Sequence, residues 1–257
     1  MKILTWNVNG YNTQIHQVLI ELVNDEQADI IFLTEIKCKA DKIKPINGYT
    51  WLINSNIPAN YHGVAMLIKD DIEFKEQRVN LNIPARYDTK SSSAATGRVI
   101  TIKIHDTYLV GVYSPNSGVN GLKNLNQRIN TWDKGLASYL DMLGNNVILI
   151  GDLNIAFSNK DVSDPGSMKH WPGFTIEERK SFKSKMVSFH DVYREFDPDG
   201  VMYTWIGNNP RRGYGMRLDH IMINNDNLLN DIESLLFYES IVVSDHIPIG
   251  CIIKLHD

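Results

Sequence analysis

The sequence predicts a layered α/β domain, and three observations lead to that prediction. Short apolar runs of strand length recur along the whole chain, and amphipathic segments with helical spacing lie between some of them. No linker rich in Pro, Gly or Ser divides the 257 residues. We therefore expect residues 1–257 to fold as one domain built of sheet and helix layers.

The strand predictions rest on runs of β-branched and other apolar residues. These runs are shorter than ordinary helices, and most are followed by polar or turn-forming residues. In chain order the expected strands are Ile3–Trp6, Ile30–Leu33, Val64–Ile68, Val99–Ile104, Tyr108–Tyr113, Val147–Ile150, Leu218–Ile223 and Ile247–Ile253.

Two stretches carry apolar residues with helical spacing. The first runs from Ile15 to Val23, with apolar side chains at i, i+3, i+4, i+7 and i+8. A second stripe of the same kind runs from Leu125 to Leu143 and includes Trp132. Residues 175–187 form a weaker helix candidate because they are strongly charged.

The composition is that of an ordinary globular protein, with 43% hydrophobic and 22% charged residues. A formal net charge of -4 and a pI near 6.1 argue against binding of nucleic acid through bulk positive charge and leave only local basic surfaces for it. The two cysteines, Cys38 and Cys251, are too few for a disulfide framework. Since the sequence shows no signal-peptide pattern and no apolar run of membrane-spanning length, we expect an intracellular, soluble protein of the cytoplasm or nucleus.

Polar residues follow several of the predicted strands. In layered α/β folds strand ends hold side chains on a rigid base, so ends at one edge of the sheets build a site together. The clusters are Asn7-Val8-Asn9-Gly10, Thr34-Glu35, Tyr113-Ser114-Pro115-Asn116, Gly151-Asp152-Leu153-Asn154 and Ser244-Asp245-His246.

The residue types in these clusters suit a hard divalent cation and a phosphate. Glu35, Asp152 and Asp245 supply carboxylate oxygens, and Asn7 and Asn154 supply carbonyl oxygens. Oxygen ligands without cysteine favour Mg²⁺ or Mn²⁺ over zinc. Such a cation engages substrate phosphates and neutralises the charge that develops on them.

The remaining polar residues suit proton transfer at a phosphodiester. His246 is expected to donate to a phosphate oxygen if a carboxylate such as Asp219 holds its other ring nitrogen. Asp152 is expected to take a proton from the attacking water, and Tyr113 to contact the phosphate or the leaving group.

Each element also has a purely structural interpretation. The Asp245-His246 pair, or a Gly-Asp-Leu-Asn segment after a strand, is often only part of a turn. Trp132 and Trp205 belong to a residue type that is more often core than substrate platform. The coincidence of these residue types at separate strand ends favours the functional interpretation, because turns alone do not require it.

The order of these motifs resembles the endonuclease/exonuclease/phosphatase superfamily, and specifically its exonuclease III branch of abasic-site endonucleases. The likeness extends from Ile3 to Ile249. Most of the polar clusters are shared across the superfamily and indicate only the reaction class. Those more particular to the DNA-repair branch are Tyr113-Ser114-Pro115-Asn116, Pro172-Gly173-Phe174-Thr175 with Glu178-Arg179, and Gly215-Met216-Arg217-Leu218-Asp219.

The resemblance implies a four-layered α/β sandwich, in which two packed, mainly antiparallel or mixed sheets are flanked by helices. It also implies a site that uses Mg²⁺, with Mn²⁺ as an alternative, and in which Glu35 is the principal ligand. The expected metal-binding residues are Asn7, Glu35, Asp152, Asn154, Asp245 and His246, and the expected catalytic residues are Tyr113, Asp152, Asn154, Asp219 and His246.

The implied reaction is hydrolysis of the phosphodiester 5′ to an abasic site in double-stranded DNA, with 3′→5′ exonuclease and 3′-phosphatase side activities. We expect a monomer. The expected substrate-binding residues are Asn116, Trp205, Met216, Arg211 and Arg212. Met216 stands where some members carry an aromatic residue. Two alternatives remain: another phosphodiesterase or phosphatase of the superfamily, or a catalytically silent DNA-binding member.

Basic residues crowd the neighbourhoods of proposed site residues. Lys37, Lys39, Lys42 and Lys44 follow Glu35, and Arg211, Arg212 and Arg217 precede Asp219. An acidic protein has to hold DNA phosphates with local patches of this kind, so we expect these residues to contact the DNA backbone.

Overall fold

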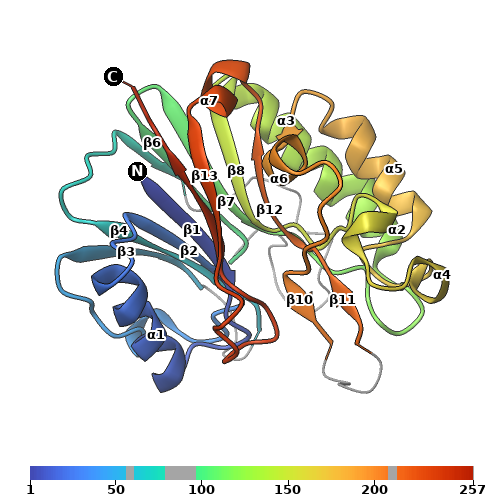
Figure 1. The fold of residues 1–257 in the computed structure, drawn as a ribbon, viewed down its shortest axis with the longest axis horizontal. Helices are drawn as coiled ribbons and strands as arrows, with labels where there is room; N and C mark the ends of the chain where they lie inside the picture. The colour runs from blue at the N-terminus through green and yellow to red at the C-terminus, as the bar shows by residue number, and fades with distance from the viewer. Residues whose placement is uncertain (56–60, 79–96, 208–212, 257) are drawn as a thin grey trace.

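The computed structural model in Figure 1 describes residues 1–55, 61–78, 97–207 and 213–256. Its strands are β1 (Lys2–Asn7), β2 (Ile30–Thr34), β3 (Tyr49–Asn54), β4 (Val64–Lys69), β5 (Glu76–Arg78), β6 (Val99–Ile104), β7 (Thr107–Tyr113), β8 (Val147–Asp152), β9 (His190–Asp191), β10 (Trp205–Ile206), β11 (Gly215–Met216), β12 (Asp219–Ile223), β13 (Ile232–Phe237) and β14 (Ile249–Ile253). Its α-helices are α1 (Thr13–Asn24), α2 (Leu125–Gln127), α3 (Asp133–Leu143), α4 (Pro165–Met168), α5 (Ile176–Lys185), α6 (Val192–Phe196) and α7 (Asp226–Asn230).

Two mixed sheets form the centre of the molecule. The first has the strand order β13-β14-β1-β2-β4-β3, and the second has the order β5-β6-β7-β8-β12-β9. In the first sheet β1 and β2 run parallel, and in the second β7 and β8 do, whereas the other pairs are antiparallel. Strands β10 and β11 form a separate antiparallel pair.

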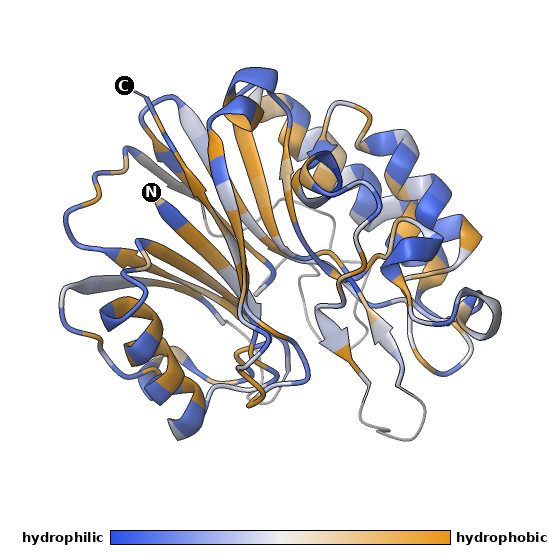
Figure 2. Cartoon of the chain, in the orientation of Figure 1, coloured by the Kyte–Doolittle hydropathy of each residue, from blue (hydrophilic) through white to orange (hydrophobic). Residues whose placement is uncertain are grey.

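The sheets pack face to face and are covered by helices on their outer faces (Figure 1). Buried apolar side chains from both sheets, such as Phe32 and Ile148, meet in the central core. On the outer face of the first sheet, α1 buries Ile15 and Leu19. On the outer face of the second sheet, α3 and α5 bury apolar side chains such as Leu136 and Phe182. In Figure 2 α1 carries both apolar and polar residues, as does a helix that covers a sheet with one face, whereas α5 is mostly polar. The expected four-layered α/β sandwich is confirmed.

Every strand expected from the sequence is present, with small shifts at the ends. The strands that were not predicted are the short β5, β9, β10 and β11, together with β3 and β13. Strands β3 and β13 lie at the two edges of the first sheet. Most of their residues are only half-buried, and β13 contains a register shift between Ile232 and Ser234. Edge strands of this kind lack the continuous apolar run that marks a central strand.

The helix expected over Leu125–Leu143 is wrong in one respect, because it is not a continuous α-helix. The chain widens into a π-helical turn at Arg128–Trp132 between α2 and α3. Such wide turns are uncommon and often lie at functional sites.

Two smaller expectations can also be compared with the structure. Cys38 and Cys251 are both free thiols. Within the residues that the structure describes, none of the helices combines the length and the apolar composition needed to cross a bilayer.

Candidate active site

The structure brings the polar strand ends together at one edge of the two sheets. Asn7 ends β1, Glu35 follows β2, and Asp152 ends β8. The side-chain amide of Asn7 donates to Glu35 Oε1 at 3.1 Å and to Asp152 Oδ2 at 2.9 Å. One buried amide therefore links the strand ends of the first sheet to those of the second.

Glu35, which follows β2 of the first sheet, is contacted by three other site residues. Its Oε1 accepts a hydrogen bond from the Tyr113 hydroxyl at 2.7 Å, and its Oε2 forms an ion pair with Lys37 Nζ at 2.6 Å. Burial alone raises the pKa of Glu35, but Lys37 outweighs it with help from Tyr113 and Asn7, so the pKa lies below its ordinary value. Glu35 is therefore an ionised carboxylate already matched to a cation.

The backbone around this carboxylate is strained. Glu35 has φ 54°, Lys37 has φ 50°, and Asn154 on the opposite sheet has φ 49°. Residues other than glycine seldom adopt this left-handed region, and where they do they concentrate at functional sites. The fold thus holds these side chains in place at a conformational cost.

Asp245 reaches Glu35 through a chain of contacts. Its Oδ1 accepts from the Asn9 side-chain amide at 3.0 Å, and the carbonyl oxygen of Asn9 accepts from Lys37. Its Oδ2 accepts from Trp205 Nε1 at 3.1 Å. Asp245 therefore lies next to Trp205, and Asn9 and Lys37 connect it to Glu35.

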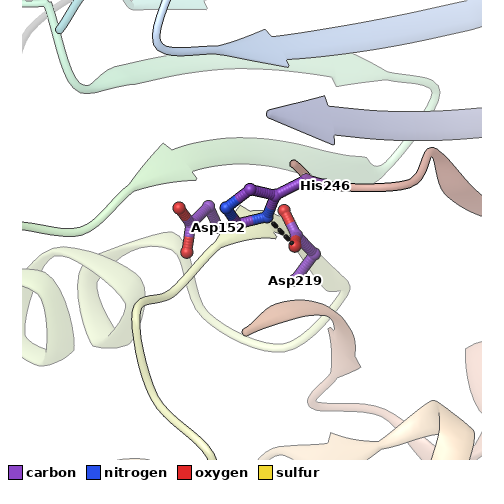
Figure 3. A group of neighbouring side chains, drawn as sticks. All are labelled: Asp152, Asp219 and His246. Carbon is purple, nitrogen blue, oxygen red and sulfur yellow. Dashed lines mark hydrogen bonds and ion pairs between the residues drawn. The ribbon is translucent and has the colours of Figure 1, made fainter. Parts of the chain in front are cut away.

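Asp152 and Asp219 of the second sheet form a buried cluster with His246, which precedes β14 of the first sheet (Figure 3). Their ligand atoms lie within 4.8 Å of one another, and His246 Nδ1 is 2.6 Å from Asp219 Oδ2. Strand register explains the proximity of the two carboxylates, because Asp219 of β12 lies directly opposite Asp152 of β8.

Burial and the Asp219 carboxylate shift the pKa of both Asp152 and His246. Burial and the facing Asp219 carboxylate raise the pKa of Asp152 to about 7. Burial lowers the pKa of His246, but the charge and hydrogen bond of Asp219, together with Asp152 and Asp245, raise it to about 10. At neutral pH the cluster therefore contains an imidazolium beside a carboxylate that is ready to accept a proton.

Asn154 and Asn116 extend the cluster along the second sheet. The Asn154 side-chain amide donates to Ser114 O at 2.9 Å, and its carbonyl oxygen accepts from Asn116 at 3.1 Å. The backbone N–H of Asn154 donates to Asp152 Oδ1 at 2.8 Å. These bonds orient both asparagines beside Asp152.

The expected substrate-binding residues have different environments. Trp205 is half-buried beside Asp245, and it pairs with Met216 between β10 and β11. Met216 is only 2% exposed and packs in a small apolar cluster with Phe174 and Leu218. Arg211 and Arg212 lie outside the described residues.

Two basic residues expected on the DNA-contacting surface have other partners. Arg217 is 2% exposed, and its guanidinium bonds to Asp161 Oδ1 at 2.7 Å and to Asp191 Oδ2 at 2.5 Å. Arg217 is therefore a buried structural cation, so its expected surface role was wrong. Lys37 pairs with Glu35 inside the site, a contact that sequence spacing alone does not reveal.

The residues present fit a hard divalent cation. The donor set is made of carboxylate and amide oxygens, and the ammonium of Lys37 already binds Glu35 as a cation would. In addition, Asp219 Oδ1 is buried without a hydrogen-bond partner among the described residues. A buried orphan oxygen of this kind calls for an explanation such as an ion or water.

Comparison with known proteins assigns the family. The family model described as Endonuclease/Exonuclease/phosphatase family matches residues 4–246. The chain belongs to this family. Nucleases of known name also resemble this chain over nearly its full length.

The DNA-(apurinic or apyrimidinic site) endonuclease of Dictyostelium discoideum is 32% identical, covering 100% of this chain and 71% of the relative. DNA repair nuclease APEX1 of Danio rerio is 33% identical over 97% of this chain and 81% of its own length. The exodeoxyribonuclease of Bacillus subtilis is 29% identical, over 99% and 100% respectively. The chain is thus of the exonuclease III type.

Solved structures agree with the fold. The AP endonuclease LMAP from Leishmania major superposes with a TM-score of 0.86 at 24% identity, covering 99% of this chain and 88% of that one. A 3′ phosphatase, NExo, from Neisseria bound to a product DNA hairpin superposes with a TM-score of 0.77 at 25% identity, covering 99% and 100%.

Proposed function

We propose that this protein is a Mg²⁺-dependent DNA repair nuclease that hydrolyses the phosphodiester 5′ to abasic sites. The observation that carries the proposal is that Asn7 joins Glu35 to Asp152 at one edge of the two sheets, and that Asp152 in turn clusters with the Asp219–His246 pair. The full-length likeness to apurinic-site endonucleases supports the choice of substrate. We propose that residues 1–257 act as a single catalytic domain and as a monomer.

Glu35 and Asn7 would hold the cation, with Asp152, Asn154 and Asp245 around it. His246, which was also expected to bind the metal, is protonated at neutral pH and acts as a donor instead. When bound, the ion supplies charge neutralisation at the scissile phosphate. The low pKa of Glu35 keeps its carboxylate ionised and available for this role. Mn²⁺ has similar ligand preferences and is the expected substitute.

The protein's own groups carry out the proton chemistry. Asp152 accepts the proton of the attacking water, because its raised pKa of about 7 makes it a better base than an ordinary carboxylate. His246, charged and fixed by Asp219 at Nδ1, donates through its other ring nitrogen, Nε2, to a phosphate oxygen. Asn154 and Tyr113 orient the phosphate, each already fixed by its own hydrogen bonds.

The substrate is double-stranded DNA with an abasic site. Asn116 and Trp205 border the catalytic residues, and Met216 supports Trp205 from the adjacent strand. The half-buried indole offers an apolar wall to a sugar without a base. The 3′→5′ exonuclease and 3′-phosphatase side activities would use the same groups.

A panel of substrates tests the assignment against its rivals. The purified protein is incubated with Mg²⁺ and either an abasic duplex, an undamaged duplex, single-stranded RNA or an inositol polyphosphate. Selective incision of the abasic duplex supports the proposal, and release of phosphate from the inositol compound overturns it. Inertness on all four substrates together with retained DNA binding would favour a silent DNA-binding module.

Replacing Glu35 by Gln is expected to raise the dissociation constant for Mg²⁺ at least about 10-fold, because the ion loses a charged ligand. Isothermal titration calorimetry measures this without reference to activity. Glu177→Gln, at an exposed position on α5, is the matched control and should bind Mg²⁺ like the wild type. Equal affinities for Glu35→Gln and the control would remove Glu35 from the metal site.

A further inference from the structure

Arg128 is a buried cation outside the site described above. It begins the π-helical turn Arg128–Trp132 and is 2% exposed. Its Nε donates to Asp133 Oδ1 at 2.8 Å, so the positive charge is matched within the same segment. The two terminal nitrogens of the guanidinium remain to bond elsewhere.

Those nitrogens bond to backbone carbonyls of two different segments. Arg128 Nη1 donates to Pro115 O at 2.6 Å, and Nη2 donates to Leu153 O at 2.7 Å. Pro115 directly precedes Asn116, and Leu153 lies between Asp152 and Asn154. One planar side chain therefore joins the two segments that carry the asparagines and the proposed base.

The neighbouring turn residues reinforce this connection. Trp132, at the other end of the π-helical turn, donates from Nε1 to Ser114 Oγ at 3.0 Å. Asp133 is itself 1% exposed, and its Oδ2 accepts from Ser181 Oγ of α5 at 2.7 Å. Asp133 thus connects Arg128 to α5, while the other guanidinium nitrogens of Arg128 bond to the segments that carry the site.

We infer that Arg128 is a positioning residue, which fixes the 113–116 segment against the 152–154 segment so that Asn116, Asn154 and Asp152 keep their mutual geometry. This inference rests on the proposed function. The rigid fork of a guanidinium bonds to two carbonyls at once in a fixed geometry, which the single ammonium of lysine does not reproduce. The role therefore requires the two bonds of the guanidinium to the carbonyls, and a buried positive charge alone does not supply it.

The variant Arg128→Lys keeps the charge and removes the fork. We expect kcat on the abasic duplex to fall on the order of 100-fold, because small displacements of catalytic groups have effects of that size. The KM should change less than kcat, because the bonds that the structure gives Arg128 reach Asp133 and two backbone carbonyls and none of the basic residues proposed to hold the DNA backbone. Leu140→Ala, at a buried position on α3, is the control for stability and should lower the melting temperature while leaving kcat unchanged. Equal losses of kcat in the two variants at matched folded fractions would overturn the inference.

Hydrogen–deuterium exchange provides a readout that does not depend on activity. In Arg128→Lys, peptides covering 113–116 and 152–154 should exchange faster while the central strands of the second sheet stay protected. Unchanged exchange in both segments would overturn the inference even if the protein cuts DNA. If the wild type proves inactive on every substrate, the proposed function fails but this exchange result still decides the role of Arg128. Should Arg128→Lys not fold, Asp133→Asn gives the same comparison, because it loosens the guanidinium without removing it.

Discussion

Asp152→Asn is expected to lower the rate of incision at an abasic site by about 10³ to 10⁴-fold, near the upper end for loss of a general base. Asparagine has nearly the same shape and can still accept the backbone hydrogen bond from Asn154, but it cannot take a proton from water. Binding of the abasic duplex should persist. Single-turnover kinetics and a binding titration in Ca²⁺ measure the two effects separately.

The same substitution is expected to make the protein more stable at neutral pH. The pKa of Asp152 is raised in the folded state, so folding opposes its ionisation, and stability falls as pH rises from the unfolded pKa toward about 7. Asparagine removes that cost together with the repulsion from Asp219. Asp141→Asn, at an exposed position on α3, is the control and should change neither rate nor melting temperature. A nearly active Asp152→Asn would remove Asp152 from the role of base.

Asp219→Asn is expected to lower the rate by about 10² to 10³-fold, as for the loss of one preorganised donor. It should also shift the whole pH–rate profile toward acid. Without the Asp219 charge the pKa of His246 falls from about 10, so the imidazolium is lost at lower pH. The pKa of Asp152 falls as well, because its like-charged neighbour is gone.

The direction of this shift separates the electrostatic account from simple disruption. Asp226→Asn, at an exposed position near the end of β12, serves as the control and should leave the profile in place. NMR titration of His246 in Asp219→Asn checks the cause directly. A slower enzyme with unmoved pH limits would contradict the role assigned to the Asp219–His246 pair.

Much of the architecture was predictable because the central strands are buried on both faces. Such strands appear as continuous apolar runs, and the polar residues that follow them, Glu35 and Asp152 among them, mark the edge where a site is built. The edge strands β3 and β13 were not predicted, because their half-buried residues interrupt that pattern.

The contacts within the site depended on geometry that spacing does not encode. The ion pair of Lys37 with Glu35 depends on a turn in which both residues have positive φ. Because spacing along the sequence does not reveal this turn, the lysine was expected to contact the DNA backbone. Arg128 belongs to a π-helical turn, whereas the apolar stripe around it indicated an ordinary helix. The opposition of Asp152 and Asp219, which shifts the pKa of Asp152, is a matter of register between strands distant in sequence.

The position of the cut in a defined duplex tests the central proposal most directly. A 5′-labelled strand carrying one tetrahydrofuran analogue is annealed to its complement, treated with the wild-type protein and resolved on a denaturing gel. We predict one product that ends immediately 5′ to the analogue in Mg²⁺, no product in EDTA and almost none with Asp152→Asn. Cleavage of the undamaged duplex at the same rate, or incision that persists in EDTA, would contradict a metal-dependent nuclease specific for abasic sites.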